Sequence, residues 1–307
     1  MKKTNLKSAA LLSLTAIIWG VAFVAQSEGM NYVGAFTFNF VRSMIGSIVL
    51  LPCISFLNHT MNDRNMKEKE KKGIDKILLI GGICCGLILF ISSNLQQIGV
   101  QYTSAGKAGF ITALYIVLVP ICGIFIKRYV GIRIWVSVLI ALCGLYLLCV
   151  TETLSFGKGD GYLLAGAVGF TIHILVIDYF VSRADAVKMA CIQFFVTGFL
   201  SGILMLIFET PKVSDILAGW LPILYAGVLS CGVAYTLQIV GQKEMNPSVA
   251  SLILSFEAVI SVVAGFIILG EALSGRELIG CVLMFIAIIL AQIPQRQNSK
   301  RTTVKRQ

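Results

Sequence analysis

Apolar residues follow one another along the chain in ten stretches of about 20 residues, separated by short polar segments. A helix of that length crosses the roughly 30 Å of hydrocarbon in a bilayer, because it rises about 1.5 Å per residue. Backbone groups in lipid must find hydrogen-bond partners within the segment, which favours helices over open strands. The pattern predicts ten transmembrane helices, at about 8–26, 34–57, 76–99, 105–127, 131–151, 160–181, 187–208, 216–240, 246–269 and 275–293.

The composition also indicates a protein that lies mainly within a membrane. Hydrophobic residues make up 57% of the 307 residues and charged residues 13%, and the mean hydropathy is +0.87. A soluble domain carries about 25% charged residues. We therefore expect an all-α integral membrane protein, with 58–76 and 295–307 as its longer polar segments. The first span has the basic start of a signal peptide, but no small-residue cleavage pattern follows it, which favours a retained helix.

The basic residues are unevenly distributed between the two sides of the predicted spans. With the N-terminus inside, 20 of the 25 Lys and Arg residues fall in inside segments and four in outside loops, while Arg42 lies within a span. This asymmetry predicts a multi-pass protein of the inner or plasma membrane with both termini cytoplasmic. Topology accounts for the net charge of +10, so no nucleic-acid partner is expected. Contact of the basic tail with anionic lipid is the less favoured alternative.

An internal repeat relates the two halves of the chain. When the sequence is shifted by 142 residues against itself, eight of the 32 positions from 95 to 126 meet an identical residue, and Tyr115 meets Glu257. Five spans is an odd number, so the second half would enter the membrane from the opposite side, as in the inverted repeats of many secondary transporters. The predicted units are a first five-helix repeat, a second five-helix repeat and a basic cytoplasmic tail, at 1–152, 153–294 and 295–307.

Several segments resemble a known family. The chain is similar to the EamA-type transporters of the drug/metabolite transporter superfamily in "FVRSMIGSIVLLP" (40–52), "YTSAGKAGFITALYIVLVPICGIF" (102–125) and "FEAVISVVAGFIILGEALSGRELIGCVLMFIAIILAQ" (256–292). The Glu, the Leu-Gly-Glu and the Gly of the family pattern correspond to Glu257, 269–271 and Gly280. The resemblance covers nearly the whole chain. It implies ten transmembrane helices in two inverted five-helix repeats and a transport activity, but no particular solute.

Two departures from the family pattern bear on local structure. Ala258 stands where the family usually has Pro after the Glu, so the ninth span is expected to be straighter at that point. Lys127 and Arg128 stand where Gly-Glu is frequent in the first repeat, so the chemistry of that loop is expected to differ.

Two ionisable residues lie deep within predicted spans. Glu257 is about 16 Å from the cytoplasmic start of the ninth span, and Arg42 is about 12 Å from the outer start of the second. Such residues are costly in lipid, usually face a cavity or each other, and often mark a substrate or ion pathway. We predict that both bind the solute or couple its transport. The alternative is a structural Arg42–Glu257 ion pair that joins two helices.

Other residues near the midplane are weaker candidates. His173, on the sixth span, is either a substrate or proton site or a hydrogen-bonded packing residue. Four aromatic residues either line a cavity and stack on an organic or cationic solute or simply pack: Trp19, Phe23, Tyr115 and Tyr235.

Further polar and small residues suit contacts between helices. Gln96 and Gln238, which the repeat relates, are expected to form helix-to-helix hydrogen bonds. The G-x-x-x-G spacings at Gly82/Gly86 and Gly198/Gly202 are expected to let helices approach closely.

The sequence favours a secondary-active transporter that exports or exchanges a small metabolite, amino acid-like or a related organic solute, by alternating access. No ATP-binding motif occurs, so a gradient would supply the energy. One alternative is a non-transporting membrane receptor or sensor that uses the same fold. A channel is disfavoured, because the chain has no repeated charge rings or carbonyl filter motif.

An enzyme is not expected, and no catalytic residue, cofactor or metal site is predicted. The segment "GKGD" (157–160) matches a motif of intramembrane aspartyl proteases, which need two facing carboxylates. Asp160 lies at a loop-to-helix boundary and is interpreted as an N-cap, while Asp178 is about 27 Å away along the same helix. The expected partners are a small-molecule substrate and the lipid bilayer, and a homodimer is left open.

Overall fold

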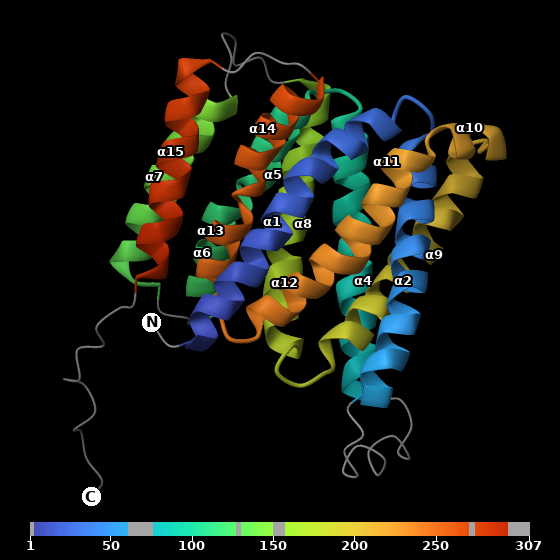
Figure 1. Ribbon diagram of the computed structural model, residues 1–307, viewed down its shortest axis with the longest axis horizontal. Helices are drawn as coiled ribbons and strands as arrows, with labels where there is room; N and C mark the ends of the chain where they lie inside the picture. Colours follow the sequence, from blue (N-terminus) through green and yellow to red (C-terminus); the bar gives the residue numbers. More distant parts are fainter. Residues whose placement is uncertain (1–2, 61–75, 127–129, 150–156, 270–273, 294–307) are drawn as a thin grey trace, which may run out of the picture.

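The structure is a computed structural model that describes residues 3–60, 76–126, 130–149, 157–269 and 274–293. These residues form helices and the short turns between them (Figure 1). The helices are α1 (Lys3–Gly29), α2 (Ala35–Thr60), α4 (Lys76–Val100), α5 (Ala105–Ala113), α6 (Tyr115–Phe125), α7 (Ile132–Cys149), α8 (Lys158–Phe180), α9 (Ala186–Phe208), α10 (Val213–Ala218), α11 (Trp220–Leu224), η1 (Tyr225–Ala234), α12 (Tyr235–Gln242), α13 (Pro247–Leu254), α14 (Glu257–Leu269) and α15 (Gly275–Gln292).

The ten predicted spans correspond to helical segments of the fold. Among the described residues, nine segments are long and apolar enough to cross a membrane, and the fifth predicted span is a shorter apolar helix at Ile132–Leu147 within α7. Three spans are composites: α5 with α6, α11 with η1 and α12, and α13 with α14. The start of α1 and the end of α15 lie at the same end of the bundle (Figure 1), as an even number of crossings requires.

The fourth and ninth spans are interrupted at related places. The first segment of the fourth span ends at Ala113, and the second begins at Tyr115. In the ninth span the first segment ends at Leu254, and the second begins at Glu257. At both breaks a backbone N–H donates to the carbonyl three residues earlier, from Leu114 to Ile111 and from Phe256 to Ile253. The second segments begin at Tyr115 and Glu257, which are 142 positions apart. The N-caps of the first segments, Ser104 and Asn246, are separated by the same 142 positions.

The expectation that Ala258 makes the ninth span straighter is wrong, because this span breaks immediately before Glu257. The Ser255 hydroxyl donates to the Leu252 carbonyl at 2.8 Å. The related break in the fourth span follows Ala113, so a tightened turn at this place does not require the serine hydroxyl either. The turn can thus form without proline. Lys127 and Arg128, and Gly270 and Glu271 of the family pattern, lie outside the described residues.

Close helix contacts occur at the expected glycines. Gly82 and Gly86 of α4 both face α9. A Cβ atom added at Gly86 would lie 2.9 Å from the Gln193 carbonyl oxygen, and Gly82 lies against the Ile192 side chain. Gly198 and Gly202 of α9 lie against side chains of α2. The expectation for both G-x-x-x-G spacings is confirmed, and α9 is packed between α2 and α4.

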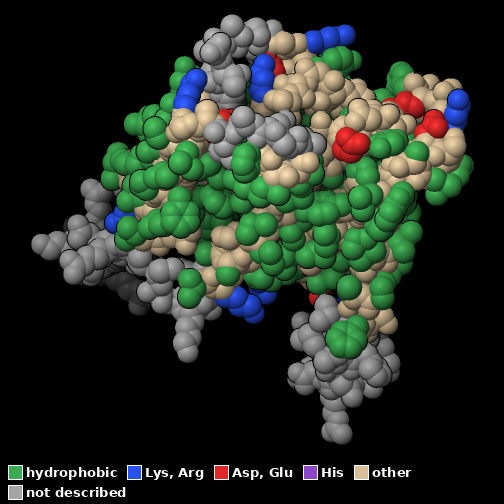
Figure 2. All heavy atoms as spheres, turned by 45° about the horizontal axis from the view of Figure 1, so that its top comes forward, with side chains coloured by type: hydrophobic (Ala, Val, Ile, Leu, Met, Phe, Trp, Pro, Cys, Tyr) green, Lys and Arg blue, Asp and Glu red, His purple; other side chains and the backbone are tan. Residues whose placement is uncertain are grey.

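The pair α7 and α15 lies at one side of the bundle (Figure 1). A Cβ atom added at Gly144 of α7 would lie 2.9 Å from the carbonyl oxygen of Gly280, the glycine of the family pattern on α15. Any larger side chain at Gly144 would push these two helices apart. Hydrophobic side chains cover most of the lateral surface in Figure 2, while the visible charged side chains lie toward its two ends. This surface suits a lipid environment.

Candidate functional site

All seven residues singled out from the sequence line one cavity inside the bundle: Trp19, Phe23, Arg42, Tyr115, His173, Tyr235 and Glu257. They come from six different helices, α1, α2, α6, α8, α12 and α14. The cavity has a volume of about 40 Å³, which is room for a few water molecules. A larger solute therefore requires side chains to rotate or helices to separate.

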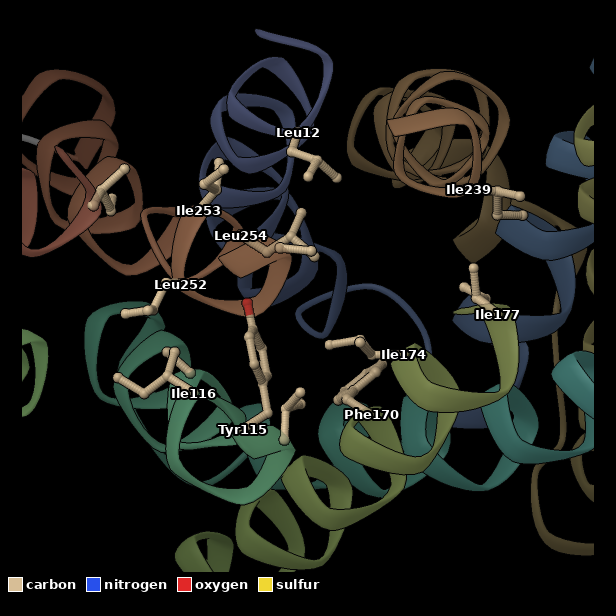
Figure 3. Packing of buried hydrophobic residues seen from close by; sticks show 14 of the residues in the cluster. Leu12, Tyr115, Ile116, Phe170, Ile174, Ile177, Ile239, Leu252, Ile253 and Leu254 are labelled. Atoms are coloured by element: carbon tan, nitrogen blue, oxygen red, sulfur yellow. The ribbon is translucent and has the colours of Figure 1, made fainter. Parts of the chain in front are cut away.

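Tyr115 and Glu257 contact each other across this cavity. The Tyr115 hydroxyl donates to a carboxylate oxygen of Glu257 at 2.9 Å, and both side chains are at least 97% buried. Figure 3 shows the Tyr115 hydroxyl directed across the core toward the segment that carries Leu252, Ile253 and Leu254. Each residue begins the second segment of its interrupted span. The two breaks therefore place the two partners at the same depth.

The start of α14 lies directly against α1. A Cβ atom added at Gly20 would lie 2.7 Å from the backbone carbonyl oxygen of Glu257. On the other side, an added Cβ at Gly109 of α5 would lie 2.9 Å from the Ser261 hydroxyl of α14. Glycine at these two positions lets α1 and α5 hold the Glu257 backbone between them, which fixes where the carboxylate enters the cavity.

Arg42 and Glu257 do not form the structural ion pair considered from the sequence. In the part of the chain that the structure describes, no carboxylate oxygen lies within 4.0 Å of the Arg42 guanidinium. The guanidinium instead lies over the Phe38 ring, 5.5 Å from its centroid. Arg42 is 6% exposed and Glu257 3%. Buried charges are costly unless they are paired or hydrogen-bonded, so this arrangement requires another reason.

His173 is held by its neighbours while it lines the cavity. Its Nε2 atom lies 3.2 Å from the Gln193 amide oxygen of α9, and its ring meets Tyr235 edge-on at 5.9 Å. Tyr235 also packs against Trp19 at 4.5 Å and Phe194 at 5.2 Å between ring centroids. These contacts favour the packing interpretation of His173, and they place its ring in a cluster of aromatic side chains.

Sequence reasoning missed some of the polar residues in the cavity wall. Gln26 of α1 lines the cavity, and its amide oxygen is buried without a hydrogen-bond partner among the described residues. Gln26 stands at the end of the first predicted span, next to Ser27 and Glu28, where a polar residue gives no signal that separates a cavity residue from one at the membrane surface. Ser230 lines the cavity from η1, a π-helical segment. Such segments often occur at functional sites, but hydropathy does not reveal them.

The two glutamines related by the repeat behave differently. Gln96 of α4 donates to the Thr112 hydroxyl of α5 at 3.2 Å, which confirms the expected helix-to-helix hydrogen bond. The same expectation is wrong for Gln238, whose amide oxygen is buried and has no partner within the described structure. Both residues line the cavity.

Asp160 is not an N-cap, as the sequence had suggested, but the third residue of α8. Its carboxylate accepts from the Gly157 N–H at 2.8 Å and forms an ion pair with Lys107 at 2.8 Å. Both contacts tie the beginning of α8 to its surroundings, and Lys107 belongs to α5. The geometry gives this carboxylate a structural role at the end of the bundle.

Comparison with known proteins places the chain among transporters. The EamA-like transporter family matches residues 6–150 and 157–292. An uncharacterized transporter of Archaeoglobus fulgidus is 29% identical over 92% of this chain and 84% of its own length. The uncharacterized transporter YoaV of Bacillus subtilis is 21% identical over 91% of this chain and 94% of its own. A solved crystal structure shares the fold, with a TM-score of 0.71 over 92% of this chain and 96% of the other, at 20% identity.

Proposed function

The chain belongs to the EamA-like transporter family, and we propose that it is a secondary transporter of an amino acid-like or related small organic solute. In this proposal it works by alternating access in the cell membrane, with both termini cytoplasmic. Its membrane spans and its relatives, which carry transporter names, support the activity class. The proposed class of solute is inferred from the residues that line the cavity.

The observation that carries the proposal is the pair of opposite charges in the cavity wall. Arg42 and Glu257 line the same small cavity without forming an ion pair with each other in the described structure. A solute with a carboxylate and an ammonium group supplies both missing partners: the guanidinium binds a carboxylate in a two-pronged geometry, and Glu257 binds the cation. Trp19 and Tyr235 add aromatic faces that attract a cation.

The interrupted spans support alternating access. Secondary transporters commonly place their substrate near the midplane, between repeats and next to broken helices. Here Tyr115 and Glu257 each follow such a break, and their hydrogen bond joins the two spans. A cavity of about 40 Å³ encloses too little space for an amino acid, so loading requires these segments to move apart and closing brings them together.

The proposal is tested by counterflow in proteoliposomes. Vesicles preloaded with unlabelled zwitterionic amino acids should accumulate the labelled compound transiently, and saturably, when they contain the purified protein. Empty vesicles are the control for leak. A receptor with the same fold would bind the solute in a thermal-shift assay and produce no exchange. Folded protein that exchanges no zwitterionic solute would contradict the proposed function.

A further inference from the structure

A group of neutral polar side chains faces the same cavity and is not used by the two charges. Gln26 and Gln238 are 4% and 1% exposed, and both line the cavity. Their amide oxygens, and the indole N–H of Trp19, are buried without hydrogen-bond partners among the described residues. Leaving such a group without a partner costs more than a typical hydrogen bond gains, so these atoms need water molecules or a ligand in the cavity as partners.

The repeat explains why Gln238 is left without a protein partner. Its counterpart Gln96 is bound by the Thr112 hydroxyl at 3.2 Å. A shift of 142 residues carries Thr112 to Leu254, which is fully buried and has no polar atom to offer. The first half of the chain thus holds its glutamine within the protein, and the second half does not.

We propose that Gln238 is a specificity-determining residue that binds a neutral hydrogen-bonding group of the solute, a hydroxyl or a carboxamide, with Gln26 and Trp19 beside it. This inference rests on the proposed function, because it concerns the part of the same site that would bind the side chain of the solute. Arg42 and Glu257 hold the charged ends of the solute, and the carboxamides of Gln238 and Gln26 each offer a donor and an acceptor to its side chain.

The placement of these residues in one cavity wall makes the assignment specific. All five of these residues line the same cavity, so a solute held between Arg42 and Glu257 lies beside the amides of Gln26 and Gln238. An apolar side chain placed there would leave the buried amides without partners, whereas a hydroxyl or carboxamide would satisfy them. The protein should therefore discriminate between solutes of similar shape by hydrogen bonding.

The test uses pairs of solutes that match in shape and differ in polarity. Proteoliposomes are assayed by counterflow with threonine against valine, asparagine against leucine, and glutamine against methionine. For at least one pair, the wild-type protein should prefer the polar member by about five- to tenfold, the value of about one neutral hydrogen bond. Gln238→Met keeps the length of the side chain, and it should abolish the preference by lowering transport of the polar member to the rate of the apolar member.

A second variant leaves Gln238 in place and gives its amide a hydrogen-bond partner within the protein. Leu254→Thr recreates the Gln96–Thr112 arrangement in the second half, so it should capture Gln238 and lower the preference in the same way. Leu252→Thr, two residues away on α13 and fully buried, is the control for placing a hydroxyl in this helix, and it should keep the wild-type preference.

The outcomes separate this inference from the proposed function. Wild-type exchange of both members of every pair at equal rates, or a preference that survives in Gln238→Met, overturns the assignment of Gln238 and leaves the transporter proposal intact. A preference that survives in Leu254→Thr overturns it as well. Wild-type vesicles that exchange none of the six solutes overturn both proposals.

Discussion

Tyr115 donates a 2.9 Å hydrogen bond to Glu257, and the two residues are separated by the 142 positions that relate the halves of the chain. Each begins the second segment of an interrupted span. A residue and its repeat counterpart therefore meet at the centre of the bundle. If the two halves are related by the predicted inverted repeat, a contact between equivalent residues lies close to the axis that relates them.

The first prediction concerns the hydroxyl of Tyr115. Tyr115→Phe removes the donor and should lower the free energy of unfolding by about 1–2 kcal/mol, because a buried carboxylate loses a hydrogen bond. It should also change transport kinetics, since it separates the two broken spans. Tyr225→Phe is the matched control: it removes a phenol hydrogen bond to the Ile18 carbonyl at 3.1 Å away from the cavity. Thermal unfolding and counterflow are measured for both. Equal transport by the two variants would refute a role for the contact.

The second prediction concerns topology. Reporter fusions after residues 30, 66, 155 and 298 should read outside, inside, outside and inside, because basic residues concentrate in the inside segments. The last three positions lie outside the described residues. Activity of a periplasmic or extracellular reporter at 30 and 155, and of a cytoplasmic reporter at 66 and 298, is the measurement. The same side for 30 and 298 would contradict both the even number of crossings and the inverted repeat.

The membrane spans and the site residues could be predicted for a simple physical reason. A continuous apolar run of about 20 residues has few alternatives to a membrane helix. Within such a run, a Glu or an Arg is conspicuous. Glu257 and Arg42 could therefore be singled out, and the structure places them at one cavity. Tyr115 could be added because the repeat aligned it with Glu257.

The remaining features depend on geometry that hydropathy does not record. The break before Glu257 occurs at one tightened turn, which is invisible in an apolar pattern. The separation of Arg42 from Glu257 depends on the lateral placement of α2 and α14, whereas the sequence gives only depth. Gln238 has no threonine beside it because Leu254 occupies the position that the repeat relates to Thr112, and this difference becomes meaningful only after the Gln96–Thr112 contact is seen.

The third prediction concerns the ion pair at the beginning of α8. Asp160 is 4% exposed, and its carboxylate binds both Lys107 and the Gly157 N–H. Asp160→Ala should lower the free energy of unfolding by about 1–3 kcal/mol, because two hydrogen bonds to a charged group are lost. Asp160→Asn keeps the acceptor for Gly157 and should cost less. Denaturation of the purified variants in detergent gives the values. A loss of transport at wild-type stability would instead assign this carboxylate to the transport cycle.

The last prediction concerns the two charges in the cavity. Glu257→Gln preserves shape and the ability to contact Tyr115, and it breaks no ion pair with Arg42. The variant should insert and fold like the wild type, with an unchanged melting temperature. Its transport should fall about thirtyfold or more, which corresponds to the roughly 2 kcal/mol or more lost when one partner of a buried charged contact is removed. Arg42→Met should fold and lose transport for the same reason.

The double variant Glu257→Gln with Arg42→Met separates solute binding from a structural role. If the two charges bind opposite ends of a solute, neither substitution compensates for the other, and the double variant should be at least as inactive as either single variant. If they served only to stabilise each other, each single change would destabilise the fold and the double change would restore it. Thermal unfolding and counterflow on all four proteins decide the matter. Wild-type transport kinetics in the double variant would refute the binding role of both residues and, with it, the proposed class of solute.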